Sequence, residues 1–142
     1  MNKNKINLEI KENPNSKVRS FHLDGNGSKN ITFYCQSYDS LINIKLNINA
    51  EIINLKKFLP IFDDECNISF KSLLHFSYIN HRSQLDLNLL ENIYNNLDKM
   101  QNLKSFKLNC INKDITKSFY YKFLEKLSKM KLNQFEFKIN PK

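Results

Sequence analysis

One pattern of apolar residues recurs four times along this chain and constrains its fold more than any other feature. The copies are Leu41-x-x-Ile44-x-Leu46, Leu73-x-x-Phe76-x-Tyr78, Leu103-x-x-Phe106-x-Leu108 and Leu132-x-x-Phe135-x-Phe137. Their first residues are separated by 32, 30 and 29 positions. Within each copy the last two apolar positions alternate, which is typical of a strand with one buried face. A period of about 20–50 residues indicates structural units that stack on one another.

The segments between the copies have the periodicity of amphipathic helices. Two apolar stripes lie 30 residues apart, one of Leu89, Ile93, Leu97 and Met100, the other of Phe119, Phe123, Leu127 and Met130. An earlier stripe consists of Ile52, Leu55, Leu59 and Phe62, and within it Pro60 is expected to bend or end a helix. We therefore expect strands over about 41–48, 72–79, 103–110 and 133–139. They should be parallel, adjacent in that order and linked by right-handed helical crossovers.

Residues 41–140 resemble leucine-rich repeats of the ribonuclease-inhibitor-like class, which repeat a strand and a helix at about this period. That class places Asn or Cys three residues after the third apolar position. Asn49 and Asn140 match this position, whereas His81 and Ile111 do not. The resemblance implies an α/β fold, a short solenoid of parallel strands alternating with helices over residues 39–142. A compact α/β sheet of two or three layers, without buried asparagines in the middle repeats, is the alternative.

The first 38 residues lack this period and carry turn signals instead. Residues 6–10, 21–23 and 31–35 alternate in polarity, and Asp24-Gly25-Asn26-Gly27 is a hairpin signal that contains both glycines of the chain. We expect an antiparallel β meander over residues 1–38 that caps the first repeat, because an end unit would otherwise expose its core. Residues 1–142 then form a single domain of ordinary size.

Composition and spacing argue against several kinds of function. The net charge of +8 comes almost wholly from lysine, since Arg19 and Arg82 are the only arginines. A bias towards residues with AT-rich codons is a sufficient explanation for much of this charge, and a selected binding site for a polyanion is the alternative. The glycines lie only in the turn, so there is no phosphate-binding loop, and no catalytic or zinc-binding spacing is present. We expect no enzymatic activity, no cofactor and no metal.

The cysteines and the hydropathy indicate where the protein resides. Cys35, Cys66 and Cys110 are odd in number and widely spaced, which favours reduced thiols over a disulfide framework. The N-terminal residues lack the apolar region of a secretory signal, and no apolar run is long enough to span a membrane. We expect a soluble intracellular protein of the cytoplasm or nucleus, without a membrane partner.

Strand parity predicts a polar surface. If the apolar residues face the helices, the alternate residues lie on the opposite face of the sheet. They are Asn43, Lys45, Asn47, His75, Ser77, Ile79, Ser105, Lys107, Asn109, Gln134, Glu136 and Lys138. Among them Lys45, Ser77, Lys107 and Glu136 are expected to form one row across the strands. Repeat proteins commonly bind through such a face, although a merely solvated sheet face is the alternative.

A second surface is basic. Lys122, Lys126 and Lys129 recur at helical spacing, with Lys131 beyond them. This is either an ordinary solvated helix face or a docking site for an acidic protein or a phosphate backbone. Our first hypothesis is a non-catalytic protein–protein interaction module, a subunit or scaffold of a larger assembly. The alternative is an accessory subunit of a nucleic-acid-containing complex that contacts phosphates through its lysines.

Two further expectations concern packing. One core cluster should contain Phe106, Leu108, Phe123, Leu127 and Phe135. The strand over 133–139 should be a sheet edge with apolar side chains, which invites pairing. We expect this edge to be covered by another chain or a second copy, or to be shielded by the preceding helix.

Overall fold

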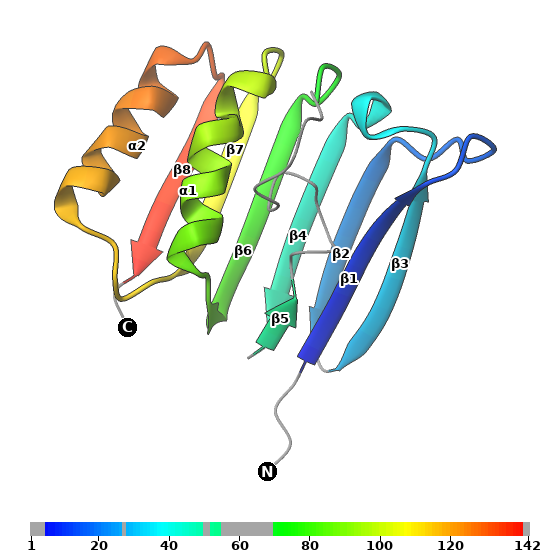
Figure 1. The fold of residues 1–142 in the computed structure, drawn as a ribbon, viewed down its shortest axis with the longest axis horizontal. Helices are drawn as coiled ribbons and strands as arrows, with labels where there is room; N and C mark the ends of the chain where they lie inside the picture. Colours follow the sequence, from blue (N-terminus) through cyan, green and yellow to red (C-terminus); the bar gives the residue numbers. More distant parts are fainter. Residues whose placement is uncertain (1–4, 27, 50–51, 55–69, 141–142) are drawn as a thin grey trace.

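The computed structural model, shown in Figure 1, describes residues 5–26, 28–49, 52–54 and 70–140. Within these ranges the chain is a mixed α/β protein with two parallel sheets and two α-helices. The smaller sheet and both helices lie on the same side of the larger sheet (Figure 1), and one hydrophobic cluster fills the space between them.

The larger sheet has the strand order β2-β4-β6-β7-β8, and each neighbouring pair is parallel. Its strands are β2 (Ser20–Asn26), β4 (Asn43–Asn49), β6 (His75–Gln84), β7 (Ser105–Ile111) and β8 (Gln134–Asn140). The four strands expected from the repeat are therefore confirmed as parallel neighbours in chain order. The register aligns equivalent positions of the copies, since Leu46 pairs with Tyr78, Tyr78 with Leu108, and Leu108 with Phe137.

The predicted antiparallel meander over residues 1–38 is wrong, because every strand pair in the described ranges is parallel. β1 (Lys5–Glu12) lies between β3 (Lys29–Cys35) and β5 (Ile52–Asn54) in the smaller sheet, which has the order β3-β1-β5. β2 is instead an edge strand of the larger sheet. The expected hairpin residues Asp24, Gly25 and Asn26 belong to β2 itself.

β2 and β3 separate into two sheets because each is apolar on one face, and the two faces cover each other across the core. The rings of Phe21 in β2 and Phe33 in β3 have centroids 4.5 Å apart. In a hairpin these rings would lie on the same face of one sheet, and a further layer would be needed to bury them. The turn signal therefore marks a crossing between layers.

The two predicted helices are present as α1 (Leu87–Asn96), which a 3₁₀ turn, η3 (Leu97–Lys99), continues, and α2 (Lys117–Lys129). Asp86 caps α1 by accepting a hydrogen bond from the Asn88 amide at 2.7 Å, and Thr116 caps α2 by accepting one from the Phe119 amide at 3.1 Å. The stripe residues that are buried are Ile93, Leu97, Met100, Phe123 and Leu127.

The segment between the first two copies begins differently from the prediction. Its first residues, Ile52–Asn54, form β5, and their backbone pairs with the start of β1. The other residues on which the expected helix rested, Leu55, Leu59, Pro60 and Phe62, lie outside the described ranges. A short 3₁₀ turn, η1 (Tyr38–Ser40), precedes β4.

The core prediction is correct at four positions and wrong at one. Fully buried are Phe106, Leu108, Phe123 and Leu127. Phe135 shares the inner face of the sheet with Phe106, its register partner, but is 43% exposed. The reason is that β8 is an edge strand, and the aromatic side chains of α2 cover Phe137 instead. The Phe123 and Phe137 ring centroids are 4.3 Å apart.

Two buried asparagines hold the ends of successive strands. The side-chain amide of Asn112 donates to the Leu85 carbonyl at 2.6 Å, and its carbonyl oxygen accepts from the Asp114 amide at 2.8 Å. The carbonyl oxygen of Asn80 accepts from the Arg82 amide at 2.9 Å. Asn80 and Asn112 lie one residue away from His81 and Ile111, the positions at which the family pattern has Asn or Cys. The repeat pattern therefore did not predict them.

Candidate functional site on the open sheet face

The open face is the side of the five-stranded sheet opposite the helices and the smaller sheet (Figure 1). The register confirms the predicted row across it: Lys45 pairs with Ser77, Ser77 with Lys107, and Lys107 with Glu136. The row two residues earlier along the strands contains Asn43, His75, Ser105 and Gln134, and the row two residues later contains Asn47, Ile79, Asn109 and Lys138. All-parallel sheets are usually covered on both faces, so a parallel sheet with one polar face uncovered within the described ranges is a candidate binding surface.

β2 extends this face by residues that the prediction missed. Ser20, His22 and Asp24 pair with the open-face residues of β4, and the His22 imidazole lies 2.8 Å from the Asp24 carboxylate. The sequence does contain a signal for this strand. Val18-x-x-Phe21-x-Leu23 repeats the apolar pattern of the other four copies, but it starts only 23 residues before Leu41. Because this spacing is shorter than the 29–32 residues between the other copies, the repeat did not predict β2.

Two polar side chains at the centre of the open face are buried without a partner. Ser77 and Asn109 are each 9% exposed, and neither the Ser77 hydroxyl oxygen nor the Asn109 carbonyl oxygen has a hydrogen-bond partner among the described residues. In contrast, His75 and Ser105 on the same two strands bond to each other at 2.8 Å. A buried polar atom without a partner costs about 1–3 kcal/mol. The face therefore contains unsatisfied hydrogen-bonding capacity.

On β4, β7 and β8 the charged side chains of the open face have no ion-pair partner among the described residues, in contrast to His22 and Asp24 on β2. Within the described ranges Lys45, Lys107, Glu136 and Lys138 form no ion pair. Lys107 is half-buried beside Ser77, whereas the other three are exposed. Short polar groups and charges of both signs on one surface are typical of hydrated protein interfaces.

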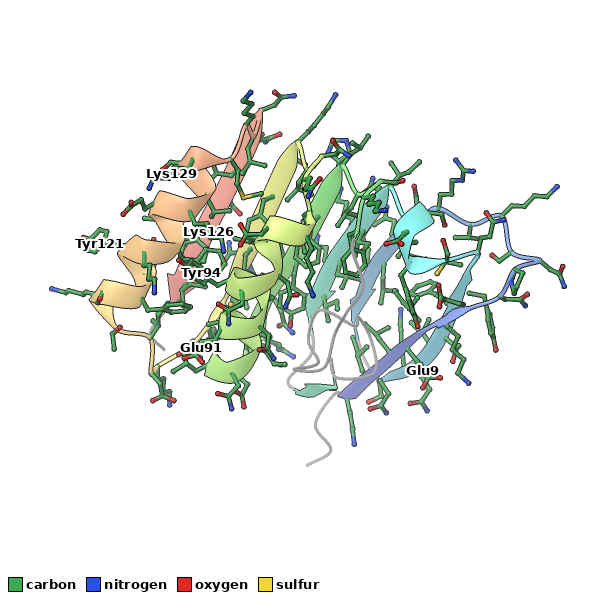
Figure 2. All side chains as sticks on the ribbon, turned by 45° about the horizontal axis from the view of Figure 1, so that its top comes forward. Glu9, Glu91, Tyr94, Tyr121, Lys126 and Lys129 are labelled. Atoms are coloured by element: carbon green, nitrogen blue, oxygen red, sulfur yellow. The ribbon has the colours of Figure 1, made fainter. Side chains whose placement is uncertain are left out.

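The predicted basic face is partly used inside the chain, as Figure 2 shows for Lys126 beside Tyr94. The Lys126 ammonium group donates to the Tyr94 carbonyl at 2.9 Å and to the Asp98 carboxylate at 3.2 Å, and it lies 4.3 Å from the centroid of the Tyr94 ring. The Lys126 ammonium group is therefore a second donor to this carbonyl in the last turn of α1, which also accepts from the Leu97 amide. Lys129 forms an ion pair with Glu125 at 2.9 Å and lowers the pKa of that carboxyl.

The other two lysines of that face are freer. The Lys122 ammonium group lies 5.6 Å from the centroid of the Tyr94 ring. Lys131 lines a groove of about 420 Å³ together with Met130, Leu97 and Met100. The four lysines therefore do not act as one set of free cations. Two of them join the helices or pair within α2.

The described thiols are poor nucleophiles. Burial raises the pKa of Cys110 to about 12, and burial together with the nearby Glu12 carboxylate raises the pKa of Cys35 to about 11. Both stay protonated at neutral pH, and the thiolate is the reactive form. Cys66 lies outside the described ranges. Among the described residues no three His, Cys, Asp or Glu side chains gather where they could hold a metal ion.

Comparison with known proteins finds no match to this chain among family models, curated proteins or solved structures. In the part of the chain that the structure describes, no helix has the length and apolar character needed to cross a membrane.

Proposed function

We propose that this chain is a non-catalytic protein-interaction module that binds another protein through its open face, as a subunit or scaffold of a larger assembly. One observation carries the proposal. Two polar atoms on that face, in Ser77 and Asn109, are buried and have no partner within the described residues. A partner that donates a hydrogen bond to Asn109 and bonds to the Ser77 hydroxyl would recover about 1–3 kcal/mol at each atom.

The surroundings of these atoms support recognition of a protein. Lys45 and Lys107 lie on either side of Ser77 in the row, and Glu136 lies beyond Lys107. Unpaired charges of both signs at fixed spacings select a partner with the complementary pattern and disfavour others. A phosphate backbone would meet Glu136 on β8 and Asp24 on β2 as repulsive charges on the same face.

We also propose that the strand–helix units form a leucine-rich-repeat-like solenoid. Its support is the aligned register of β4, β6, β7 and β8, the two helices on one side, and the Asn112 side chain, which bonds to the Leu85 carbonyl of the preceding unit. In such folds the strand face is the usual binding surface.

Site-specific photo-cross-linking tests the open face directly. A photoreactive phenylalanine analogue at Lys45 should capture a partner in extracts of the native source, and mass spectrometry would then identify it. The matched control is the same analogue at Tyr34, which is 48% exposed on the smaller sheet. Equal capture from both positions would contradict the proposal.

Two substitutions then test the contacts with the purified partner. Lys107→Glu should weaken binding by about tenfold or more while the protein stays folded. Ser77→Ala should weaken binding but leave the free energy of unfolding unchanged or raised, because it removes an unsatisfied buried group. Unchanged affinity in both folded variants would exclude the open face. Strong binding of generic RNA or DNA that falls steeply with salt would instead favour the nucleic-acid alternative.

A further inference from the structure

We propose that the free edge of β8 pairs antiparallel with β8 of a second copy of this chain, which joins two five-stranded sheets into one continuous sheet. β8 is the last strand of the sheet, and among the described residues only β7 pairs with it. An edge of seven regular residues offers unpaired backbone groups to another strand.

The backbone of β8 shows which groups are free. The Gln134 amide donates to the Lys104 carbonyl at 3.3 Å, and the Asn140 carbonyl accepts from the Asn112 amide at 2.8 Å, so both groups point towards β7. In a parallel ladder, the amide and carbonyl of one residue point to the same edge of the strand, and those of the next residue point to the opposite edge. Phe135, Phe137 and Ile139 therefore direct their amides and carbonyls to the free edge.

This parity restricts the register of antiparallel pairing. Residues with outward backbone groups must lie opposite one another, and a slip of one residue would place an apolar side chain on the polar face. The register centred on Phe137 satisfies both conditions. It pairs Phe135 with Ile139 of the second copy, and the twofold symmetry repeats that pair on the other side of Phe137.

Charge then selects this register over its neighbours. With Phe137 at the centre, Glu136 lies opposite Lys138 of the second copy, and the symmetry makes this pair twice. A shift by two positions in one direction places Glu136 opposite itself, and the opposite shift places Lys138 opposite itself. Like charges directly opposite one another destabilise a strand pair, whereas opposite charges stabilise it.

The exposed apolar surface lies where this pairing would cover it. Phe135 is 43% exposed on the inner face, next to the position that Ile139 of the second copy would take. Tyr121 is 65% exposed, and Figure 2 shows it on the side of α2 that points away from α1. Lys126 and Phe123 define the α1 side, since both contact Tyr94. Pairing through β8 would bring the two outer sides of α2 towards each other.

The twofold axis of such a pair is perpendicular to the sheet, so both open faces point in the same direction. The dimer would present two copies of the proposed binding face on one continuous surface, and a partner with two matching segments would gain avidity. The pairing itself uses only β8 and α2. It stands or falls independently of whether the open face binds a partner.

Sedimentation analysis of the purified 142-residue chain, from low micromolar to millimolar concentration, tests the proposal. We expect a reversible dimer that does not grow further, because the isologous pairing closes on itself. Glu136→Lys and Lys138→Glu should each weaken dimerisation by about ten- to hundredfold, since each creates two like-charge pairs. The double variant Glu136→Lys/Lys138→Glu should restore it. Lys45→Glu, the same charge change on a distant strand of that face, is the control and should have no effect.

Hydrogen exchange of the unmodified chain provides a second measurement, which does not depend on whether a substituted protein folds correctly. The amides of Phe135, Phe137 and Ile139 point away from β7, so they should exchange rapidly in dilute protein and become protected as concentration rises. A monomer at millimolar concentration would overturn the proposal. So would a double variant as weak as the single ones, or rapid exchange of these three amides in the dimer.

Discussion

Replacement of Phe106 by alanine tests how the core is divided between the sheet and the helices. The Phe106 side chain is fully buried, and it stacks on Phe76 at a centroid distance of 5.7 Å and lies 6.1 Å from Phe123 of α2. It therefore connects two adjacent strands and the last helix. Its removal should leave a cavity that the surrounding strands cannot close, because their register holds them in place.

The structure sets the size of the effect and provides a matched control. A fully buried phenylalanine truncated to alanine costs about 3–5 kcal/mol in free energy of unfolding. Phe135 is the same residue type, on the same face of the next strand and in register with Phe106, but it is 43% exposed. Its truncation removes about half the buried area and leaves no closed cavity, so we expect a loss of about 1–1.5 kcal/mol.

Urea denaturation followed by circular dichroism measures both losses. It should be done in dilute protein, so that pairing through β8 does not add to the apparent stability. A loss below about 1 kcal/mol for Phe106→Ala would show that the strand faces are assigned the wrong way round. Equal losses for the two variants would show that another element covers Phe135. The first result would also remove the basis for the open face.

Three further predictions use the same measurement. Asn112→Ala should lower the free energy of unfolding by about 2–3 kcal/mol, because it leaves the buried Leu85 carbonyl without the Asn112 donor. Asn109→Ala is the control and should lower it by less than about 1 kcal/mol, because the Asn109 carbonyl oxygen has no partner among the described residues. Lys126→Met should cost about 1 kcal/mol, since it keeps the aliphatic contact but removes the ammonium group's bonds to the Tyr94 carbonyl and the Asp98 carboxylate. Equal stability would show that solvent replaces the ammonium group. Between pH 9 and 12 the unfolded chain loses the Cys110 proton that the folded chain retains, so the free energy of unfolding should fall as pH rises. This fall should be shallower in Cys110→Ala. Identical slopes of unfolding free energy against pH in the two proteins would contradict the raised pKa.

Local pattern was sufficient to predict much of the larger sheet. A strand buried on one face must alternate in polarity, and a unit that stacks on its neighbour must repeat at a constant spacing. β4, β6, β7 and β8 satisfy both conditions, so their order, direction and face follow from the positions of the apolar residues. The row of Lys45, Ser77, Lys107 and Glu136 followed from the same spacing.

The smaller sheet could not be predicted in this way. β1 comes first in the chain yet lies between β3 and β5, and β2 leaves its expected hairpin partner for the larger sheet. Alternation of polar and apolar residues indicates that a strand has one buried face. The neighbour with which that strand pairs depends on contacts between segments that are distant in the sequence. Phe21 and Phe33 would alternate identically in a hairpin and in two facing sheets. Only the assembled core distinguishes the two arrangements.

The candidate site shows the same division. The sequence determined which residues share the open face, because parity along a strand is a local property. Tertiary structure decided that Ser77 and Asn109 are buried without partners, that Lys126 bonds to a carbonyl of α1, and that Phe135 stays exposed at an edge. Each of these depends on neighbours that arrive from other units, such as the Tyr94 carbonyl, 32 residues before Lys126. Hydrogen-bond satisfaction and burial are properties of that assembled environment, and no local pattern encodes them.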